Sequence, residues 1–149
     1  MYLTKDVIPP ENFLGHQEFK AGANVLFLGR IRDGSEGRKV LYLEYEAYQE
    51  MAERMIRDLI HEAQDQWPLE KIQILHRLGK VELGQIAVGI EVQAIHRDEA
   101  YQASRFLIEG IKHKVPIWKK ETFEDGTSAW TRCPPRQRLN GALNEGVGC

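Results

Sequence analysis

The chain has 149 residues, of which 42% are hydrophobic, and a formal net charge of −2. This composition predicts one globular domain with a buried core, and the slightly acidic balance argues against a protein built to coat nucleic acid. No apolar run approaches the roughly 20 residues that span a bilayer, and residues 1–6 lack the pattern of a signal peptide, so we expect a cytoplasmic protein.

The first predicted elements are two strands. Val25, Phe27 and Ile31 alternate on one face of residues 23–32, and a strand pattern resumes at residues 40–45. The break at residues 33–37 contains two glycines, which favour a turn. This spacing predicts a hairpin between the two strands, with a mobile tip.

A helix follows, because the spacing of apolar residues changes from two to three and four. Pro68 stops it just after Trp67, since proline cannot continue a helix. The apolar stripe is expected to pack on the sheet and consists of Tyr48, Met51, Ala52, Met55, Ile56, Leu59, Ile60 and Ala63.

Two more strands and a second helix come next. The strands are predicted around residues 72–76 and 86–94, with turns at Gly79 and Gly84. Asp98 is the expected N-cap of the helix, and Pro116 ends it. The buried face of this helix is predicted to contain Ala100, Ala103, Leu107, Ile108 and Ile111.

Residues 117–123 and 128–130 predict a last hairpin around the Asp125-Gly126 turn. The resulting order is ββαββαββ, and its short links between strands favour antiparallel pairing. An α+β fold with a mainly antiparallel sheet and two principal helices is therefore expected, rather than a doubly wound parallel sheet. We place the domain at residues 1–133 and a flexible C-terminal tail at residues 134–149.

The second helix has the features of an anion site. His96 and Arg97 lie at its start, where free backbone N–H groups and the positive end of the helix dipole favour a phosphate. Lys112 and Lys119 follow at its other end and supply amines.

Several motifs together resemble the large, catalytic subunit of molybdopterin synthase over roughly residues 22–130. They are Gly29-Arg30-Ile31-Arg32, Leu43-Glu44-Tyr45-Glu46-Ala47-Tyr48 with Met51-Ala52, His76-Arg77-Leu78-Gly79, Ala94-Ile95-His96-Arg97, and Lys112 with Val115-Pro116-Ile117-Trp118-Lys119-Lys120-Glu121. The resemblance implies an α/β-hammerhead fold. It also implies sulfur transfer in molybdenum cofactor biosynthesis, within a homodimer that carries one small subunit at each end.

In that family the small ubiquitin-like subunit carries sulfur as a thiocarboxylate on its C-terminal Gly-Gly, and two sulfurs are placed on cyclic pyranopterin monophosphate. Both reactants are anionic, so they repel each other by about 4 kcal/mol at 4 Å and an effective dielectric of 20. The resemblance makes Arg32, His96 and Arg97 the substrate-binding residues, and Lys112 and Lys119 the catalytic ones.

Some roles stay open. Lys112 is either a proton shuttle or a stabiliser of the tetrahedral oxyanion. Arg77 fits a structural ion pair as well as a substrate contact, and Arg132 and Arg136 are candidates to reach a neighbouring site across the dimer. Glu121 is expected to orient Lys119 by a salt bridge.

Other functions find less support. The histidines lack metal-ligand spacing, Cys133 and Cys149 fit no zinc or disulfide pattern, and no P-loop or dinucleotide motif occurs, so neither metal nor cofactor is expected. The net charge of −2 disfavours an RNA-binding domain. A non-enzymatic module that binds an anion or an acidic protein tail explains the lysines equally well, but not the recurrence of all these motifs at family spacing.

Overall fold

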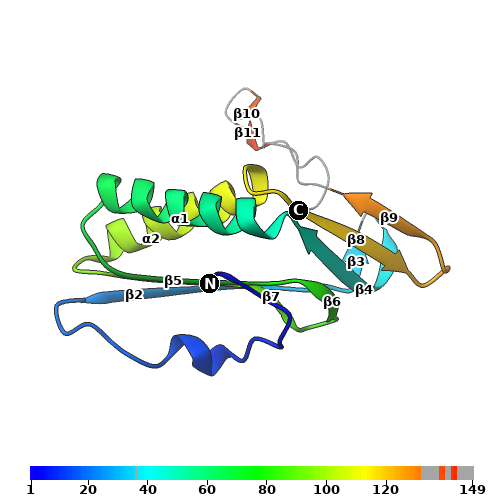
Figure 1. Cartoon of the computed structure of the whole chain (residues 1–149), viewed down its shortest axis with the longest axis horizontal. Coiled ribbons are helices and arrows are strands. Elements are labelled where there is room, and N and C mark those ends of the chain that lie inside the picture. The colour runs from blue at the N-terminus through cyan, green and yellow to red at the C-terminus, as the bar shows by residue number, and fades with distance from the viewer. Residues whose placement is uncertain (36, 132–137, 140–141, 144–149) are drawn as a thin grey trace.

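The computed structural model describes residues 1–35, 37–131, 138–139 and 142–143 (Figure 1). The helices are α1 (Gln49–Gln66), α2 (Arg97–His113) and the short 3-10 helix η1 (Pro10–Phe13). The strands are β1 (Leu3–Thr4), β2 (Ala23–Arg30), β3 (Gly34–Ser35), β4 (Arg38–Ala47), β5 (Leu69–Arg77), β6 (Gly79–Glu82), β7 (Ile86–Ala94), β8 (Ile117–Phe123), β9 (Ser128–Thr131), β10 (Arg138–Leu139) and β11 (Ala142–Leu143). No helix in these ranges is long and apolar enough to cross a membrane.

One sheet has the strand order β1-β5-β7-β2 and is covered on both faces. Helices α1 and α2 lie on one face, and the N-terminal segment with η1 lies on the other (Figure 1). Every residue of β7 is therefore buried, from Ile86 to Ala94. Phe13 presses its ring against Gly89, where a Cβ would collide with it. This close approach explains a glycine in the middle of a central strand.

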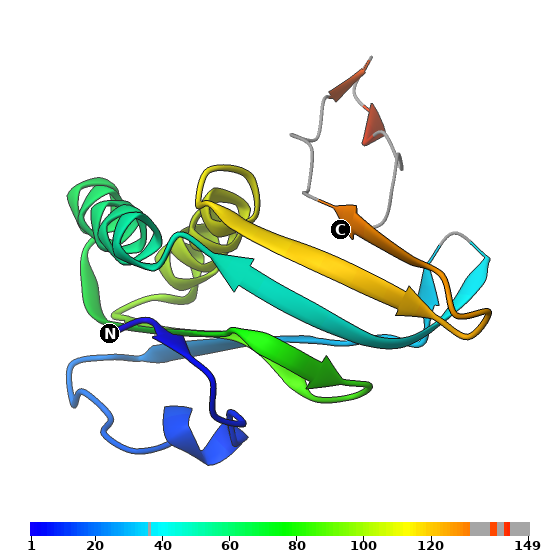
Figure 2. The ribbon, with the colours of Figure 1, turned by 45° about the vertical axis from the view of Figure 1, so that its right-hand side comes forward.

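A second sheet has the order β3-β4-β8-β9, with β6 also pairing with β4. Figure 2 shows it projecting sideways from the ends of the helices. Strands β4 and β8 are antiparallel, and their register places Tyr45 opposite Lys119 and Leu43 opposite Glu121. These four side chains therefore share one face of the sheet.

The α+β class, both principal helices and the last hairpin are confirmed. Helix α1 ends at Gln66, just before the predicted stop at Pro68. In the last hairpin, Gly126 has a φ of +85° and the Phe123 N–H donates to the Thr127 carbonyl. The predicted turn at Gly84 is present, whereas Gly79 begins β6, a short strand that the sequence pattern did not indicate.

The predicted hairpin between residues 23–32 and 40–45 is wrong. Strand β2 pairs with β7 in the first sheet, and β4 pairs with β8 in the second. The physical reason is that β2 is apolar on both faces: Val25 packs against the main core, while Leu26 and Leu28 pack on the cluster around Phe13. Only a sheet that is covered on both faces can bury such a strand.

Asp98 is not the N-cap of α2, because that position belongs to His96, which makes no side-chain capping hydrogen bond. Asp98 lies in the first turn and accepts a hydrogen bond from Gln102 at 2.7 Å. A carboxylate there still interacts favourably with the helix dipole.

Most of the predicted tail, residues 134–149, lies outside the described residues, as do Arg132, Cys133, Arg136 and Cys149. Within the described part of the tail, β10 pairs antiparallel with β11. The domain boundary at residue 133 stays a prediction.

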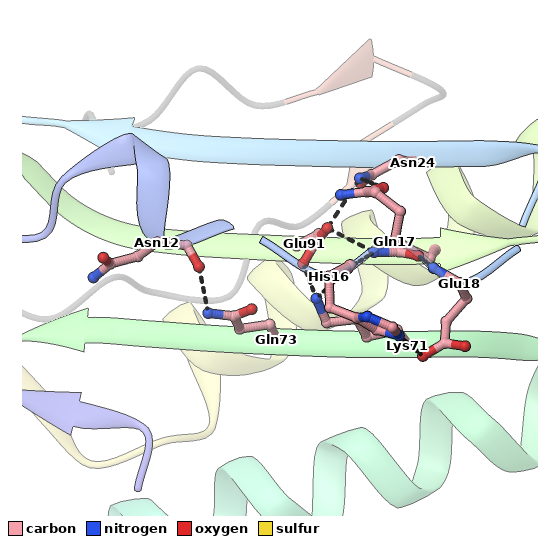
Figure 3. Close-up of polar contacts among 9 residues, drawn as sticks. Asn12, His16, Gln17, Glu18, Asn24, Lys71, Gln73 and Glu91 are labelled. Atoms are coloured by element: carbon pink, nitrogen blue, oxygen red, sulfur yellow. Dashed lines mark hydrogen bonds and ion pairs between the residues drawn. The ribbon is translucent and has the colours of Figure 1, made fainter. Parts of the chain in front are cut away.

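A buried polar network ties the N-terminal segment to the sheet (Figure 3). Glu91 is fully buried and forms an ion pair with Lys71 at 3.0 Å. Asn24 and Gln93 also donate hydrogen bonds to its Oε1 atom, at 2.9 and 2.8 Å. Lys71 and Gln93 in turn donate to the carbonyl oxygen of His16. One carboxylate therefore organises the groups that hold the loop after η1.

We expect Glu91→Ala to lower the free energy of unfolding by about 3 kcal/mol, because it leaves the charge of Lys71 without its buried carboxylate and removes one acceptor each from Asn24 and Gln93. Urea denaturation measures this change. The control is Glu82→Ala, which breaks the exposed 3.2 Å pair with Lys80 and should cost less than about 1 kcal/mol. Equal losses for the two variants would contradict the role of Glu91.

Candidate active site

A narrow pocket lies where the C-terminal end of α2 meets the second sheet. Lys112 comes from the last turn of α2, Lys119 from β8 and Tyr45 from β4. The pocket has a volume of about 80 Å³. Its lining consists of Arg30, Ile31, Arg32, Gly34, Val40, Leu43, Tyr45, Lys112, Lys119 and Glu121.

The connection between α2 and β8 brings the two lysines together. Helix α2 stops at His113, and the buried residues Val115 and Pro116 reverse the chain so that β8 begins at Ile117. The Pro116 carbonyl accepts a hydrogen bond from the backbone N–H of Tyr48, which fixes this turn to the start of α1. Figure 2 shows the end of α2 turning directly into β8.

The pocket holds like charges close together. Burial, followed by the nearby charge of Lys119, lowers the pKa of Lys112 from 10.5 to about 8. Both effects disfavour the protonated amine. Lys112 therefore carries a proton that it can lose near neutral pH, whereas an ordinary lysine keeps its proton there.

Glu121 supplies the negative charge in the pocket. Its Oε1 atom lies 3.5 Å from Lys119 Nζ, and both side chains are largely buried. The predicted salt bridge is thus present. Burial and the charge of Glu121 raise the pKa of Tyr45, so its hydroxyl stays protonated and able to donate a hydrogen bond.

The structure brings together three of the five predicted site residues. Arg32 lines the pocket with Lys112 and Lys119, although its side chain is exposed. His96 and Arg97 are also exposed, but they lie at the opposite end of α2, about 22 Å from Lys112 along the helix axis. Within one chain these two residues do not contribute to the lysine pocket.

Arg77 does not line the pocket. It is buried and donates a hydrogen bond to the Lys80 carbonyl at 2.8 Å. His76, its neighbour, points to the other face of β5 and contributes to the site instead.

Sequence reasoning assigned no role to Tyr45 or His76, although both belong to the quoted motifs, and it considered Arg30 only as a residue beside the mobile hairpin that could close over substrate. Tyr45 and Arg30 line the lysine pocket, and Arg30 also donates to the Gly84 carbonyl at 2.9 Å. Only the pairing of β4 with β8, which is not encoded locally, could have placed Tyr45 opposite Lys119. Among the described residues, no group of three or more His, Cys, Asp or Glu side chains could hold a metal ion.

Fold and site together define an α+β protein with a pocket lined by two lysines and two arginines. The model of the family described as MoaE protein matches residues 3–114. The molybdopterin synthase catalytic subunit of Halalkalibacterium halodurans is 47% identical over 106 residues, which cover 71% of this chain and 68% of that protein. The protein of the same name from Thermoplasma volcanium is 41% identical over 126 residues, covering 85% and 92%.

Solved structures agree with these relationships. Molybdopterin synthase from Staphylococcus aureus has a TM-score of 0.81 at 40% identity, covering 87% of this chain and 95% of that chain. A Helicobacter pylori protein, described in a complex of subunits 1 and 2 of molybdopterin-converting factor, shares the fold with a TM-score of 0.72 at 22% identity, covering 87% and 88%. The chain belongs to the MoaE family, the family of molybdopterin synthase catalytic subunits, which are sulfurtransferases of molybdenum cofactor biosynthesis.

Burial of the charged Lys112 amine should lower the free energy of unfolding. We expect Lys112→Met to raise the free energy of unfolding by about 2 kcal/mol at pH 6.5, because it removes a charge that burial and Lys119 disfavour. The unfolded chain binds the proton more tightly than the folded chain, so the penalty is full below pH 8 and shrinks as the pH rises toward 10.5.

Urea denaturation at pH 6.5 and pH 9.5 measures both parts of this prediction. The stability gain of Lys112→Met should be clearly larger at pH 6.5. A variant that is less stable than the wild type at both pH values would show that Lys112 contributes to the fold.

Proposed function

We propose that this chain transfers sulfur from the C-terminal thiocarboxylate of a small ubiquitin-like subunit to cyclic pyranopterin monophosphate, forming the dithiolene of molybdopterin. The observation that carries this proposal is the lysine pocket, where Lys112 and Lys119 face one carboxylate, Glu121. Membership of the MoaE family supports the substrate and the partner. As an enzyme of cofactor biosynthesis, it is assigned to the cytoplasm.

The charge balance of the pocket suits two anionic reactants. Arg30 and Arg32 add to the positive charge of the lysines, while Glu121 pairs with Lys119. A thiocarboxylate and a phosphate repel each other unless cations lie between them. The excess of cations offsets this repulsion and concentrates both reactants in one place.

The charge and the lowered pKa of Lys112 suit it to act on the reacting acyl group. With a pKa of about 8, it is mainly protonated at pH 7, and its charge stabilises the oxyanion that forms when water adds to the acyl carbon of a thioester between the small subunit and the pterin. The acyl–sulfur bond then breaks, which returns a carboxylate to the small subunit and leaves the sulfur on the pterin. The same amine releases its proton readily, so it also serves as a proton donor to the leaving sulfur. Lys119, held by Glu121, positions the carboxyl end of the small subunit.

The two reactants require different spaces. The lysine pocket, at about 80 Å³, is much smaller than the roughly 300 Å³ typical of a small-molecule site, so it suits the narrow Gly-Gly end of the partner. A groove of about 520 Å³ lies on the other side of Lys112, between α2 and β2. Its lining consists of Val25, Leu26, Phe27, Tyr101, Ser104, Arg105, Ile108, Glu109, Lys112 and His113. Lys112 thus lies between a site for the tail and a site for the pterin.

A second copy of the chain would complete the groove with His96 and Arg97. In the described residues, β2 is an edge strand with one unpaired side, and the exposed side chains of Phe27 and Tyr101 lie beside it in the groove. Two copies of α2 that cross antiparallel near Ser104 place residue 97 of one copy beside residue 112 of the other. The proposed homodimer therefore brings the phosphate-binding pair of one protomer to the lysines of its partner.

Variants of the lysines test the proposed activity. With a thiocarboxylated small subunit and cyclic pyranopterin monophosphate, Lys112→Ala should lower the rate of molybdopterin formation by about 10²–10⁴-fold. Lys119→Ala should lower it by about 10²-fold. Mass spectrometry of the pterin product measures the rates.

The matched control is Lys120→Ala, because Lys120 lies on the same strand but faces the opposite side and pairs with Glu44 at 3.9 Å. It should keep near-normal activity. Wild-type protein that forms no sulfur-containing pterin, or full turnover by Lys112→Ala, would contradict the proposal.

Mixed dimers test whether the active site is shared. A protomer with Lys112→Ala is co-expressed with a protomer that carries both His96→Ala and Arg97→Ala, and the mixed dimer is purified through two different tags. One of its two sites then has all its residues intact, so roughly half of the wild-type activity should return. Each variant alone should form an inactive homodimer. An inactive mixed dimer would contradict a shared site.

A further inference from the structure

A small chamber shares Tyr45, Lys112 and Lys119 with the lysine pocket. It has a volume of about 20 Å³, which is enough room for one water molecule. The hydroxyl of Thr131 is buried there and has no hydrogen-bond partner among the described residues. The chamber is lined by Tyr45, His76, Ile111, Lys112, Ile117, Lys119 and Thr131.

His76 is the most deeply buried titratable group in this lining. Only 2% of the residue is exposed, and its ring meets the Tyr45 ring edge-on with centroids 5.0 Å apart. Its Nδ1 atom lies 2.7 Å from the carbonyl oxygen of Arg77. A carbonyl can only accept, so Nδ1 carries the proton and Nε2 keeps its lone pair.

We infer that His76 is a positioning residue for Lys112. The Nε2 lone pair of His76 and the Thr131 hydroxyl hold one water in the chamber. Through this water they accept a hydrogen bond from the Lys112 amine and fix its direction. This inference rests on the proposed function in one respect only: the fixed direction of the amine aims Lys112 at the acyl group. The chamber geometry stands independently of it.

None of the charged groups described around Lys112 is available to accept a hydrogen bond from its amine, so a neutral acceptor is needed. Lys119 repels the amine, and Glu121 is engaged with Lys119 at 3.5 Å. Tyr45 remains a protonated donor, and Arg30 and Arg32 from the end of β2 and the following loop add positive charge. On α2 itself, Glu109 pairs with His113 at 3.0 Å.

The titration of His76 agrees with this geometry. Burial, followed by the charge of Lys112, lowers the pKa of His76 to about 4, so the ring stays neutral wherever the enzyme works. A base this weak cannot remove the proton of Lys112, whose pKa is about 8. It acts as an acceptor that orients the amine, not as the general base of the reaction.

The test measures the protonation of Lys112 directly. Competitive labelling with acetic anhydride, followed by mass spectrometry of the peptide that contains Lys112, gives the pH of half-maximal labelling without partner or substrate. His76→Phe keeps the aromatic packing on Tyr45 but loses the acceptor. We expect it to lower this pH by about one unit and to reduce the rate of sulfur transfer about tenfold.

His76→Gln retains an acceptor and should stay close to the wild type in both measurements. The control is His61→Phe, because His61 is exposed on α1 and should change neither. An unchanged or higher half-labelling pH in His76→Phe overturns the inference.

If His76→Phe does not fold, Thr131→Val decides the question. It removes the chamber hydroxyl at nearly constant volume and should lower the half-labelling pH in the same direction, whereas no shift overturns the inference. Because labelling needs no substrate, these outcomes remain interpretable even if the chain transfers no sulfur.

Discussion

The structure depends on one electrostatic constraint: two lysine amines are held in one pocket whose described lining contains a single carboxylate, Glu121. Lys112 and Lys119 repel each other, and Glu121 offsets only part of that repulsion. The energy that keeps them together comes from elsewhere, from the packing of α2 on β7 and β2 and from the pairing of β4 with β8. The rigid Val115-Pro116 turn and the pairing of Tyr45 with Lys119 are the local means by which the fold imposes this arrangement.

The fold separates this strained site from its most stable region. The first sheet is buried on both faces, and the Glu91 network lies on the face away from the helices, so that region is held by apolar burial and a buried ion pair. The second sheet projects from the helices and carries the reactive groups on one face. The charges that destabilise the protein therefore lie in a pocket on the second sheet, apart from the first sheet and its buried network.

Local patterns predicted the parts of the fold that depend on local interactions. The apolar stripe of α1, its stop before Pro68 and the Asp125-Gly126 turn are determined by neighbouring residues, and all three are present. Strand pairing depends on distant residues. The alternation in β2 could not reveal that Leu26 and Leu28 also need a buried face, so the expected hairpin with β4 is wrong.

The same distinction applies to the site. Lys112 and Lys119 are seven residues apart, with one turn between them, so their proximity could be predicted. Tyr45 and His76 join them only through the pairing of β4 with β8 and of β5 with β7. His96 and Arg97 were predicted as part of the same site from their motif, but the length of a helix separates them from the lysines.

Among the described residues β2 has an unpaired edge, and this has a consequence for the cell through mass action. On the proposed assembly, a lone protomer has lysines without phosphate-binding partners and also exposes unpaired backbone groups along this edge. Where protomers are dilute enough to separate, the number of complete sites grows with the square of the protomer concentration. A modest change in expression level would then produce a disproportionate change in molybdopterin output, so the abundance of this chain would act as a steep control on its own pathway.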